Sequence, residues 1–311
     1  MNKILIIDDL HPNIVPMLKS IGYDVDYEPT ITEKEVYNRI ENYTGLLLRS
    51  KMFIGVEILS KATKLKFIAR AGAGIDQIVE EEVLSRGIKL LNAPEGNRDA
   101  VAEHVLGMIL TLFNNIHIGN TQVKNGLWLR EENRGHELNG KTVGIIGYGN
   151  NGKAFAKLLK GFNCQVLAYD ILHRQNYEDE NSKAAEMEDI FEHADIVSFH
   201  TSLTNETDEL VNNQYISKFK KNIWLFNLSR GKIVVLKDLL DNIDSGKIKG
   251  AGLDVLTNEN LKTFKEKEPN IYARLMASDK IILTPHVGGW TFESHAKINE
   301  VLFDKIKALQ L

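Results

Sequence analysis

The chain has 311 residues, of which 43% are hydrophobic and 26% are charged, and its formal net charge is −4 at pH 7. This length predicts two domains with substantial hydrophobic cores, and the small net charge gives no reason to expect nucleic acid or an anionic membrane as a partner. The single cysteine, Cys164, excludes an intramolecular disulfide and a cysteine-rich zinc site, so no metal is expected.

The first residues and the most apolar stretch of the chain bear on where the protein works. Residues 1–3 lead straight into an apolar run, so we expect no signal peptide. The stretch 100–118 is interrupted by Glu103 and His104, and it lacks the run of about 20 apolar residues that a membrane span needs. We therefore expect a buried helix at 100–118 and a cytoplasmic protein.

Short apolar runs alternate with segments of helical length in the first third of the chain. The runs predict strands at residues 3–7, 23–27, 45–49, 66–71 and 89–92. Among the intervening segments, 33–42 and 77–86 have the length of helices. This alternation is typical of a parallel sheet wound with helices.

A second alternating series follows a long helix that begins after Asp99. Its runs predict strands at residues 143–147, 165–169, 196–200, 224–227, 250–255 and 281–284. The last helical stretch, 293–309, has no strand of its own and is expected to return to the first domain. The sequence thus predicts an α/β protein with two doubly wound parallel-sheet domains, a discontinuous one at 1–97 plus 286–311 and a second at 98–285.

The second series opens on a glycine pattern, G-x-G-x-x-G, formed by Gly147, Gly149 and Gly152. In a dinucleotide site, the first glycine permits a tight turn, the second lets the backbone approach a pyrophosphate, and the third allows close helix–strand packing. The N-terminus of the following helix then offers its N–H groups to the phosphates. Glycines also end strands for purely structural reasons, so an ordinary strand–turn–helix stays open as the alternative.

The surroundings of the glycine pattern favour the dinucleotide site. A β-branched apolar strand precedes it, and a helical stretch at 153–162 follows. The next strand ends in Asp170, roughly 20 residues on, where a carboxylate would hold the ribose hydroxyls of NAD and repel a 2′-phosphate. His173 and Arg174 lie close behind and could soften that repulsion. We therefore predict two Rossmann-like domains, of which 98–285 binds NAD.

Three polar residues, Arg230, Glu259 and His286, follow strands in the second half of the chain. An NAD-dependent enzyme of hydroxy acids needs a cation for the substrate carboxylate, a general acid/base for the hydroxyl proton, and a partner that orients the base. Ligands of open α/β sheets bind at the carboxyl ends of strands, so all three residues are suitably placed. Each also has an ordinary interpretation: the arginine as a helix cap or solvated, the glutamate as part of a solvated charged run, and the histidine as a packed turn residue.

Beyond these three residues, motifs along nearly the whole chain resemble the D-isomer-specific 2-hydroxyacid dehydrogenase family, and within it most the D-3-phosphoglycerate dehydrogenases. The matching segments are residues 70–76, 92–97, 101–104, 137–142, 200–204 and 246–255. The resemblance implies an active site in the cleft between the two domains and a homodimer formed through the cofactor domain, with residues 100–128 contributing. The chain ends at Leu311 without the C-terminal regulatory domains that many of these dehydrogenases carry, so feedback by serine is not expected.

The resemblance also implies roles at the reacting centre. Arg230 would bind the substrate carboxylate and carbonyl oxygen through its fixed donor fork, and the backbone N–H groups of Ala73 and Gly74 would share the carboxylate. His286 would donate the proton in reduction and accept it in oxidation. Glu259 would accept a hydrogen bond from the other ring nitrogen, which fixes the tautomer and favours the imidazolium.

NAD is the cofactor that the resemblance implies, with Asp254 at the nicotinamide amide. The implied cofactor-binding residues are Gly147, Gly149, Asn150, Asn151, Gly152, Asp170, Thr201, Leu228, Ser229, Asp254, Gly288 and Gly289. Asn150 and Asn151 depart from the family pattern, which has an arginine or histidine followed by an apolar residue. The loss of a charged phosphate contact predicts weaker binding of NAD. Ser202 likewise replaces a usual proline, and segment 258–279 is unusually long and charged.

A second polar set follows strands of the first domain. The resemblance places Arg49, Ser50 and Asn97 around a substrate phosphate, with Lys51 and Arg98 adding charge, although an arginine at a strand end can also be merely solvated. It thus implies NAD-dependent oxidation of D-3-phosphoglycerate to 3-phosphohydroxypyruvate, the first step of serine biosynthesis. The alternatives are a glyoxylate or hydroxypyruvate reductase, another D-2-hydroxyacid dehydrogenase and, more remotely, an NAD-sensing corepressor-like binding protein.

Three further residues have alternative roles. His200 is a rival for the catalytic base, although the resemblance favours a structural role beside the cofactor loop. His104 lies on the apolar helix and is expected to be buried and hydrogen-bonded. Trp290 follows Gly289 and either walls a cofactor cleft or simply packs.

Overall fold

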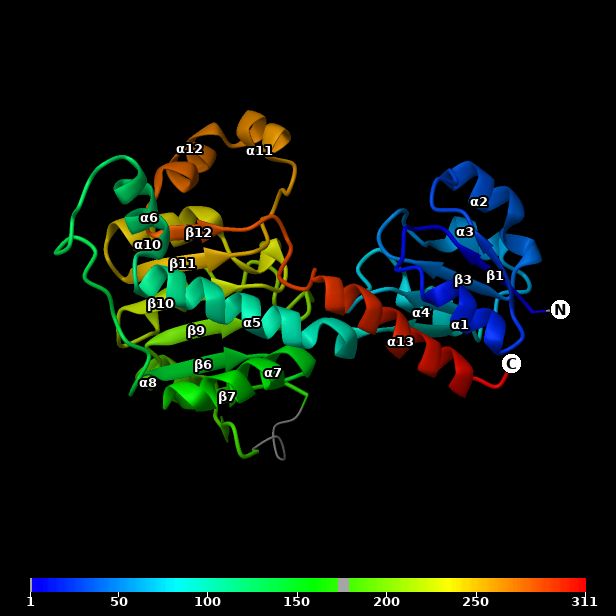
Figure 1. Ribbon diagram of the computed structural model, residues 1–311, viewed down its shortest axis with the longest axis horizontal. Coiled ribbons are helices and arrows are strands. Elements are labelled where there is room, and N and C mark those ends of the chain that lie inside the picture. Colours follow the sequence, from blue (N-terminus) through cyan, green and yellow to red (C-terminus); the bar gives the residue numbers. More distant parts are fainter. Residues whose placement is uncertain (1, 173–178) are drawn as a thin grey trace. The chain divides into compact units, whose positions relative to one another are not determined.

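The computed structural model describes residues 2–172 and 179–311, which form two compact units (Figure 1). Unit 1 comprises Met1–Arg98 and Trp290–Leu311, and unit 2 comprises Asp99–Gly289. Each unit has its own sheet, and the two sheets have five and seven strands. The second boundary lies after Gly289 rather than before His286, because the turn that carries this histidine is hydrogen-bonded to unit 2, as described below.

The sheet of unit 1 is parallel throughout and has the order β2-β1-β3-β4-β5. Its strands are β1 (Lys3–Ile6), β2 (Asp24–Tyr27), β3 (Gly45–Leu48), β4 (Phe67–Arg70) and β5 (Lys89–Asn92). Successive side chains of a strand point to opposite faces. Ile4 and Ile6 accordingly pack in one hydrophobic cluster, while Leu5 and Ile7 pack in another. Both faces of the sheet are therefore buried, which explains the continuous apolar runs of the sequence.

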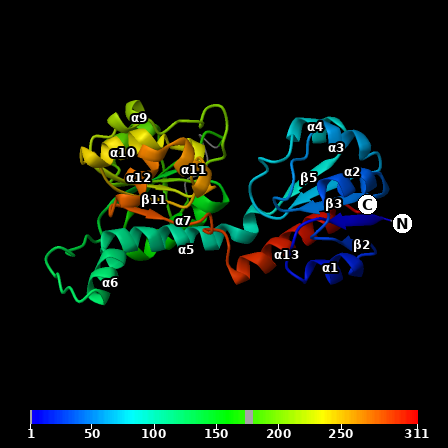
Figure 2. The same ribbon diagram turned by 90° about the horizontal axis from the view of Figure 1, so that it is seen from above.

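Helices cover both faces of this sheet. They are α1 (Ile14–Ser20), α2 (Glu33–Arg39), the 3₁₀ turn η1 (Ile40–Asn42), α3 (Val56–Lys61), α4 (Glu80–Ser85) and α13 (Phe292–Ala308). Helices α1 and α13 lie together on one face, and α2, α3 and α4 lie on the other (Figure 2). In α13, Ile298, Leu302 and Ile306 recur every four residues and pack in the same cluster as β1. The C-terminal helix thus belongs to unit 1.

The sheet of unit 2 has the order β12-β11-β10-β9-β6-β7-β8 and is also parallel. Its strands are β6 (Thr142–Ile146), β7 (Gln165–Tyr169), β8 (Lys183–Ala184), β9 (Ile196–Phe199), β10 (Ile223–Asn227), β11 (Ile248–Leu253) and β12 (Ile281–Leu283). The first strand of the series, β6, lies between β9 and β7, so the strand order reverses at this point. Such a reversal is where doubly wound sheets bind their ligands.

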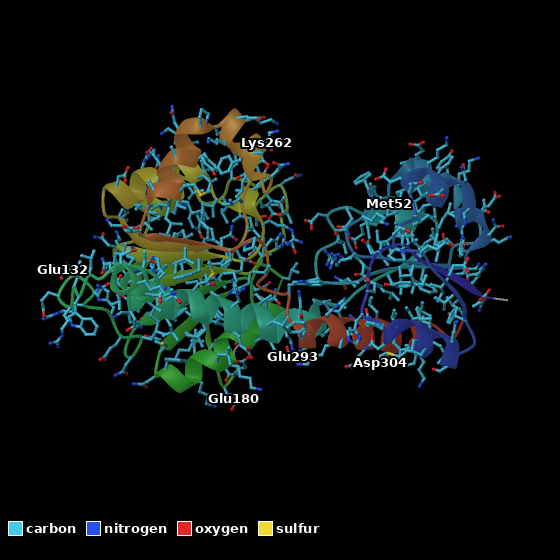
Figure 3. All side chains as sticks on the ribbon, turned by 45° about the horizontal axis from the view of Figure 1, so that its top comes forward. Met52, Glu132, Glu180, Lys262, Glu293 and Asp304 are labelled. Carbon is cyan, nitrogen blue, oxygen red and sulfur yellow. The ribbon has the colours of Figure 1, made fainter. Side chains whose placement is uncertain are left out.

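The helices of unit 2 cover its two faces with side chains that fill the space above and below the strands (Figure 3). They are α5 (Pro94–Phe113), which begins in unit 1, α7 (Asn150–Leu159), η2 (Lys160–Phe162), α8 (Met187–His193), α9 (Asn213–Ser217), η3 (Gly231–Ile233), α10 (Leu236–Asp244), α11 (Leu261–Lys267) and α12 (Pro269–Ala277). A further helix, α6 (Ile116–Lys124), has no buried residue. Residues of α5 and α7 pack in one cluster with Val143 and Ile145 of β6, and residues of α8, α9 and α10 pack in the other cluster with Ile146.

The apolar stretch 100–118 falls on α5 and α6. Within the described residues, no single helix is long and apolar enough to cross a membrane. Taken together, α5 and α6 have the length and apolar composition of a membrane span, but the chain bends by 59° where the two helices meet. The bend occurs at Asn115, whose left-handed φ of 49° ends the first helix before the second begins.

Candidate active site and cofactor site

The candidate residues of unit 2 share one edge of its sheet. The glycine pattern follows β6, Asp170 follows β7 and Thr201 follows β9. The candidate catalytic residues follow the remaining strands: Arg230 follows β10, Glu259 follows β11 and His286 follows β12. Because all these strands are parallel neighbours, their carboxyl ends lie at the same edge. The structure thus gathers the predicted cofactor and catalytic residues of this unit at the place where α/β sheets bind ligands.

His286 and Glu259 form a close pair. The Nδ1 atom of His286 lies 2.9 Å from Oε1 and 3.1 Å from Oε2 of Glu259. About half of each side chain is exposed, at 49% for the histidine and 50% for the glutamate. The carboxylate therefore orients the ring through Nδ1, which leaves Nε2 as the nitrogen that can exchange a proton with a substrate.

The turn that carries His286 is held by Asp254. This carboxylate is only 3% exposed. Its Oδ1 accepts hydrogen bonds from Thr284 Oγ1 at 2.6 Å and from the Val287 N–H at 2.9 Å. Its Oδ2 accepts a hydrogen bond from the Gly288 N–H at 2.8 Å. The backbone N–H of His286 donates to the Asp254 carbonyl at 2.8 Å. Sequence reasoning missed this role, because the resemblance directed Asp254 toward the nicotinamide amide.

Two features extend this network. The Nε2 atom of His104 lies 3.0 Å from Oγ1 of Thr284, so the histidine of α5 is hydrogen-bonded, as expected. It is only partly buried, however, since 25% of its side chain is exposed. A Cβ at position 288 would stand 2.9 Å from Oδ2 of Asp254, which explains why a glycine occupies this position. The strained turn, with a left-handed φ of 55° at His286, is thus fixed from several sides.

Arg230 lies in a loop that is fixed by its neighbours. Asn227 Nδ2 donates to the Arg230 carbonyl at 2.9 Å, and Ser229 Oγ donates to the Phe199 carbonyl at 2.7 Å. The next residue, Gly231, packs so closely on the backbone of Leu256 that a Cβ would collide with it. The Arg230 side chain is partly exposed, and its Nη1 donates to the Ser229 carbonyl at 2.7 Å. Its guanidinium is therefore held at the same sheet edge as the His286–Glu259 pair, from the neighbouring strand.

The glycine pattern has the geometry of a phosphate cradle. Gly147 has a φ of 94°, and a Cβ there would stand 2.7 Å from the His200 carbonyl group. A Cβ on Gly152 would collide with the Gly147 carbonyl oxygen. At Gly149, by contrast, no described atom lies within 4 Å of the Cβ position, so the loop is open where a pyrophosphate would approach. Helix α7 starts directly behind, at Asn150, with no side-chain cap.

Other residues at this edge fit a dinucleotide. Asp170 Oδ2 accepts the Tyr148 N–H at 2.8 Å and Oδ1 accepts the Leu172 N–H at 2.9 Å, so the carboxylate is held beside the glycine turn. Oδ1 of Asn151 and Oγ1 of Thr201 are buried without a hydrogen-bond partner among the described residues. Such groups normally have a partner, and a bound NAD would supply one. His173 and Arg174 lie outside the described residues.

His200 has the properties of a structural residue. Its Nε2 lies 2.9 Å from Ser198 Oγ, and its ring packs 5.7 Å from the ring of Phe155. Burial lowers the pKa of His200 to about 4, so the ring is neutral at neutral pH. A general base is most effective when its pKa is near the working pH. His200 is therefore a poorer candidate for the base than His286.

In unit 1, the predicted substrate residues also share one sheet edge. Arg49 and Ser50 follow β3, Ala73 and Gly74 follow β4, and Asn97 lies in the first turns of α5 after β5. The loops after neighbouring strands are joined by hydrogen bonds. The Ala73 carbonyl accepts from Asn92 Nδ2 at 2.7 Å, and the carbonyl before it, of Gly72, accepts the Ala93 N–H at 2.8 Å. Oδ1 of Asn97 is buried with no partner in the described part of the chain.

The loop after β3 is organised by Asp8. Its Oδ2 accepts the N–H groups of Arg49 at 2.6 Å, Ser50 at 3.0 Å and Lys51 at 3.1 Å. The Lys51 ammonium donates to the carbonyls of Pro29 and Ile31. This lysine is thus engaged with the chain itself, whereas the sequence suggested that it adds charge at the substrate.

Comparison with known proteins now identifies the family. Residues 106–288 match the profile of the D-isomer specific 2-hydroxyacid dehydrogenase, NAD binding domain. The chain belongs to this family. Members of the D-2-hydroxyacid dehydrogenase family are NAD-dependent oxidoreductases, and unit 2 is the NAD-binding domain. The predicted family, the fold of two parallel-sheet α/β domains and the cofactor are thereby confirmed. Among the described residues, no group of three or more His, Cys, Asp and Glu is arranged to hold a metal ion.

Individual dehydrogenases of the family resemble the chain along its whole length. It is 32% identical to D-3-phosphoglycerate dehydrogenase of Methanocaldococcus jannaschii over 99% of this chain and 57% of that one. It is also 32% identical to hydroxypyruvate reductase of Thermotoga maritima, over 89% and 88% of the two chains. The chain spans about half the length of the phosphoglycerate dehydrogenases it matches.

Solved structures agree with this family membership. D-lactate dehydrogenase of Aquifex aeolicus, which was solved with NAD and lactic acid, is 26% identical and superposes with a TM-score of 0.82 over 99% of this chain and 95% of that one. The TT0316 protein of Thermus thermophilus superposes with the same TM-score at 27% identity, over 99% and 96% of the chains.

Proposed function

We propose that this dehydrogenase oxidises D-3-phosphoglycerate to 3-phosphohydroxypyruvate with NAD, a reaction of serine biosynthesis. The observation that carries the dehydrogenase chemistry is the His286–Glu259 pair, 2.9 Å apart, at the sheet edge that also presents Arg230 and the glycine cradle. The names of the phosphoglycerate dehydrogenases at about 30% identity support the choice of substrate. A cytoplasmic location stays a prediction.

For the three residues we propose the roles that the resemblance implies, which the hydrogen bond between His286 and Glu259 supports. Arg230 binds the substrate carboxylate and the oxygen on the reacting carbon through its guanidinium fork. Nε2 of His286 accepts the hydroxyl proton in oxidation and returns it in reduction, while Glu259 holds Nδ1 and stabilises the charged ring. The glycine turn after β6 and the start of α7 would hold NAD, which would supply the hydride acceptor for oxidation of that carbon.

The tail of the substrate is assigned to unit 1. We propose that Arg49, Ser50 and Asn97 bind the phosphate, and that backbone N–H groups of Ala73 and Gly74 bind the carboxylate. Arg49 and Ser50 lie in the loop after β3, and Asn97 lies in the first turns of α5 after β5, so all of these groups lie at one sheet edge. A guanidinium, a hydroxyl and an amide at one edge form a suitable donor set for a phosphate.

A second candidate is reduction of glyoxylate or hydroxypyruvate. It is favoured by the relative named hydroxypyruvate reductase, which is 32% identical to this chain over 89% of its length. These substrates lack a phosphate, so they would leave Arg49 without a role in binding.

One assay separates these candidates. NAD(H)-linked rates should be measured with phosphohydroxypyruvate, hydroxypyruvate, glyoxylate and pyruvate. The proposed function requires the highest kcat/KM for phosphohydroxypyruvate. A preference for glyoxylate or hydroxypyruvate would replace it with the reductase, and NAD binding without turnover of any of the four would favour a corepressor-like binding protein.

A further inference from the structure

The guanidinium of Arg49 lies on the face of an indole ring. Its Cζ atom is 4.4 Å from the ring centroid of Trp290, well inside the range of a cation–π interaction. Both residues belong to unit 1: Arg49 follows β3, and Trp290 directly precedes α13. The contact therefore joins two segments that are far apart in the sequence but belong to one compact unit.

The backbone of Arg49 is fixed independently of this contact. Its N–H donates to Asp8, and its carbonyl accepts hydrogen bonds from Arg70 Nε at 3.1 Å and Gln77 Nε2 at 2.6 Å. In the described part of the chain, no carboxylate lies within salt-bridge distance of its guanidinium. An aromatic face thus orients the side chain and, unlike a carboxylate, leaves both the charge and the N–H edge available to an anion.

The Trp290 ring also packs against other aromatic side chains. The ring of His295 lies 4.8 Å from it, and the ring of His11 lies 5.4 Å beyond in an edge-to-face arrangement. Burial, together with the nearby His11 and Arg49, lowers the pKa of His295, and Asp9 opposes this shift only in part. His295 is therefore neutral at neutral pH and supports the indole without adding a second charge. Trp290 is 46% exposed, so filling the core does not account for its position.

We propose that Trp290 is a positioning residue that determines specificity for an anionic substrate tail, because it holds the Arg49 guanidinium in the orientation that binds a phosphate. The inference rests on the proposed function, which assigns Arg49 to the tail. It adds a residue to which neither the sequence nor the resemblance gave this role. Trp290 follows His286 by four positions, so one short segment carries both the proposed base and the residue that orients the tail-binding arginine.

The test compares two substrates that differ only in the phosphate, phosphohydroxypyruvate and hydroxypyruvate, in full-length protein with NADH. Trp290→Leu should raise KM for phosphohydroxypyruvate about three- to tenfold, as expected from the loss of a cation–π contact. The kcat values and the KM for hydroxypyruvate should change little. Trp290→Phe, which keeps a weaker aromatic face, should restore most of the loss. Phe292→Leu is the matched control, since Phe292 is 95% exposed two residues away and should change neither substrate.

A double-mutant cycle with Arg49→Ala makes the result decisive. The effect of Trp290→Leu on phosphohydroxypyruvate should disappear when Arg49 is already alanine. If Trp290→Leu leaves the substrate ratio unchanged while Arg49→Ala lowers it, the inference is wrong and the proposed function stands. If Arg49→Ala slows both substrates equally, the tail assignment fails and the inference falls with it. Should Trp290→Leu fail to fold, Trp290→Phe in both backgrounds gives the same comparison with an expected change of about twofold.

Discussion

At the scale of single residues, the site separates two histidines by their surroundings. His286 is half exposed and faces the Glu259 carboxylate, whereas the ring of His200 is enclosed beside Phe155 and Ser198. We predict that His286→Asn lowers turnover by roughly 10²–10⁴-fold, because the proton donor is removed. NADH binding, measured by fluorescence titration, should be largely kept. If His200→Asn abolishes turnover while His286→Asn does not, the base has been assigned to the wrong histidine.

Glu259 should affect turnover less than His286 does. Glu259→Gln keeps a hydrogen-bond acceptor near Nδ1, so the ring should stay largely oriented. Glu259→Ala removes that acceptor, and turnover should fall further because Nε2 is then less well directed at the substrate. Initial rates of reduction by the two variants measure this difference. Equal rates would mean that the hydrogen bond does not orient the base.

His200 predicts a pH dependence of stability. Its pKa is about 4 in the folded protein, below the 6.5 of an unperturbed histidine. As the pH falls below 6.5, the unfolded chain binds a proton that the folded chain does not, so the unfolding free energy decreases between pH 6.5 and 4. The expected loss is about 3 kcal/mol, from roughly 1.4 kcal/mol per pKa unit.

Urea unfolding at pH 7.5 and pH 4.5 measures this contribution. His200→Gln should be less stable at pH 7.5, and its stability should fall less on acidification because the titrating group is absent. An equal fall in both proteins would show that the stability lost on acidification comes from other groups.

At the scale of elements, the sequence predicted most strands to within two residues. Residues 89–92 and 165–169 match β5 and β7 at both ends. Other predicted strands were one residue too long, as at Ile7 and His200, because the sequence pattern does not show where the hydrogen bonds between strands end. Strand β8 was not predicted, since its two exposed residues, Lys183 and Ala184, carry no apolar pattern. Glycine spacing found the cofactor turn because backbone conformation requires those residues directly.

The candidate site was less predictable than the elements. The position of Arg230, Glu259 and His286 after strands followed from the sequence, but their roles came from the resemblance. Asp254 fixes the His286 turn through three hydrogen bonds to residues about thirty positions away in the sequence. The contact of Arg49 with Trp290 joins residues separated by most of the chain. Local patterns carry no signal for such contacts, because any of several acidic or aromatic residues could have made them.

The end of β7 should decide cofactor choice. Asp170 is held beside the glycine turn by its bonds to the N–H groups of Tyr148 and Leu172, where a carboxylate accepts the ribose hydroxyls and repels a 2′-phosphate. We predict that NAD is preferred over NADP and that Asp170→Ala narrows the difference. The ratio of kcat/KM values for the two cofactors measures this. Equal efficiency of the unmutated protein with both would contradict the prediction.

At the scale of the whole molecule, one projection of unit 2 carries a cluster of exposed apolar side chains. The segment around Glu132 extends away from the rest of this unit (Figure 3). Ile116 and Val123 of α6, and Leu127 and Trp128 just after it, are each at least half exposed, and the tryptophan is 77% exposed. A cluster of large apolar side chains on a projecting segment is typical of a surface that another chain covers. We propose that a second copy of this dehydrogenase covers it.

The corresponding prediction concerns the mass in solution. The unmutated protein should be a dimer by light scattering, and Trp128→Ser should weaken the dimer strongly. Truncating a central interface tryptophan costs about 2 kcal/mol or more, and a twofold interface loses it twice, so the dissociation constant should rise by about 10³-fold. Leu84→Ser is the control, because Leu84 is 54% exposed on α4 of unit 1, outside this projection. If the unmutated protein is monomeric at tens of micromolar, the proposed homodimer is wrong. If the Trp128→Ser variant dimerises as tightly as the unmutated protein, the dimer interface lies on another surface.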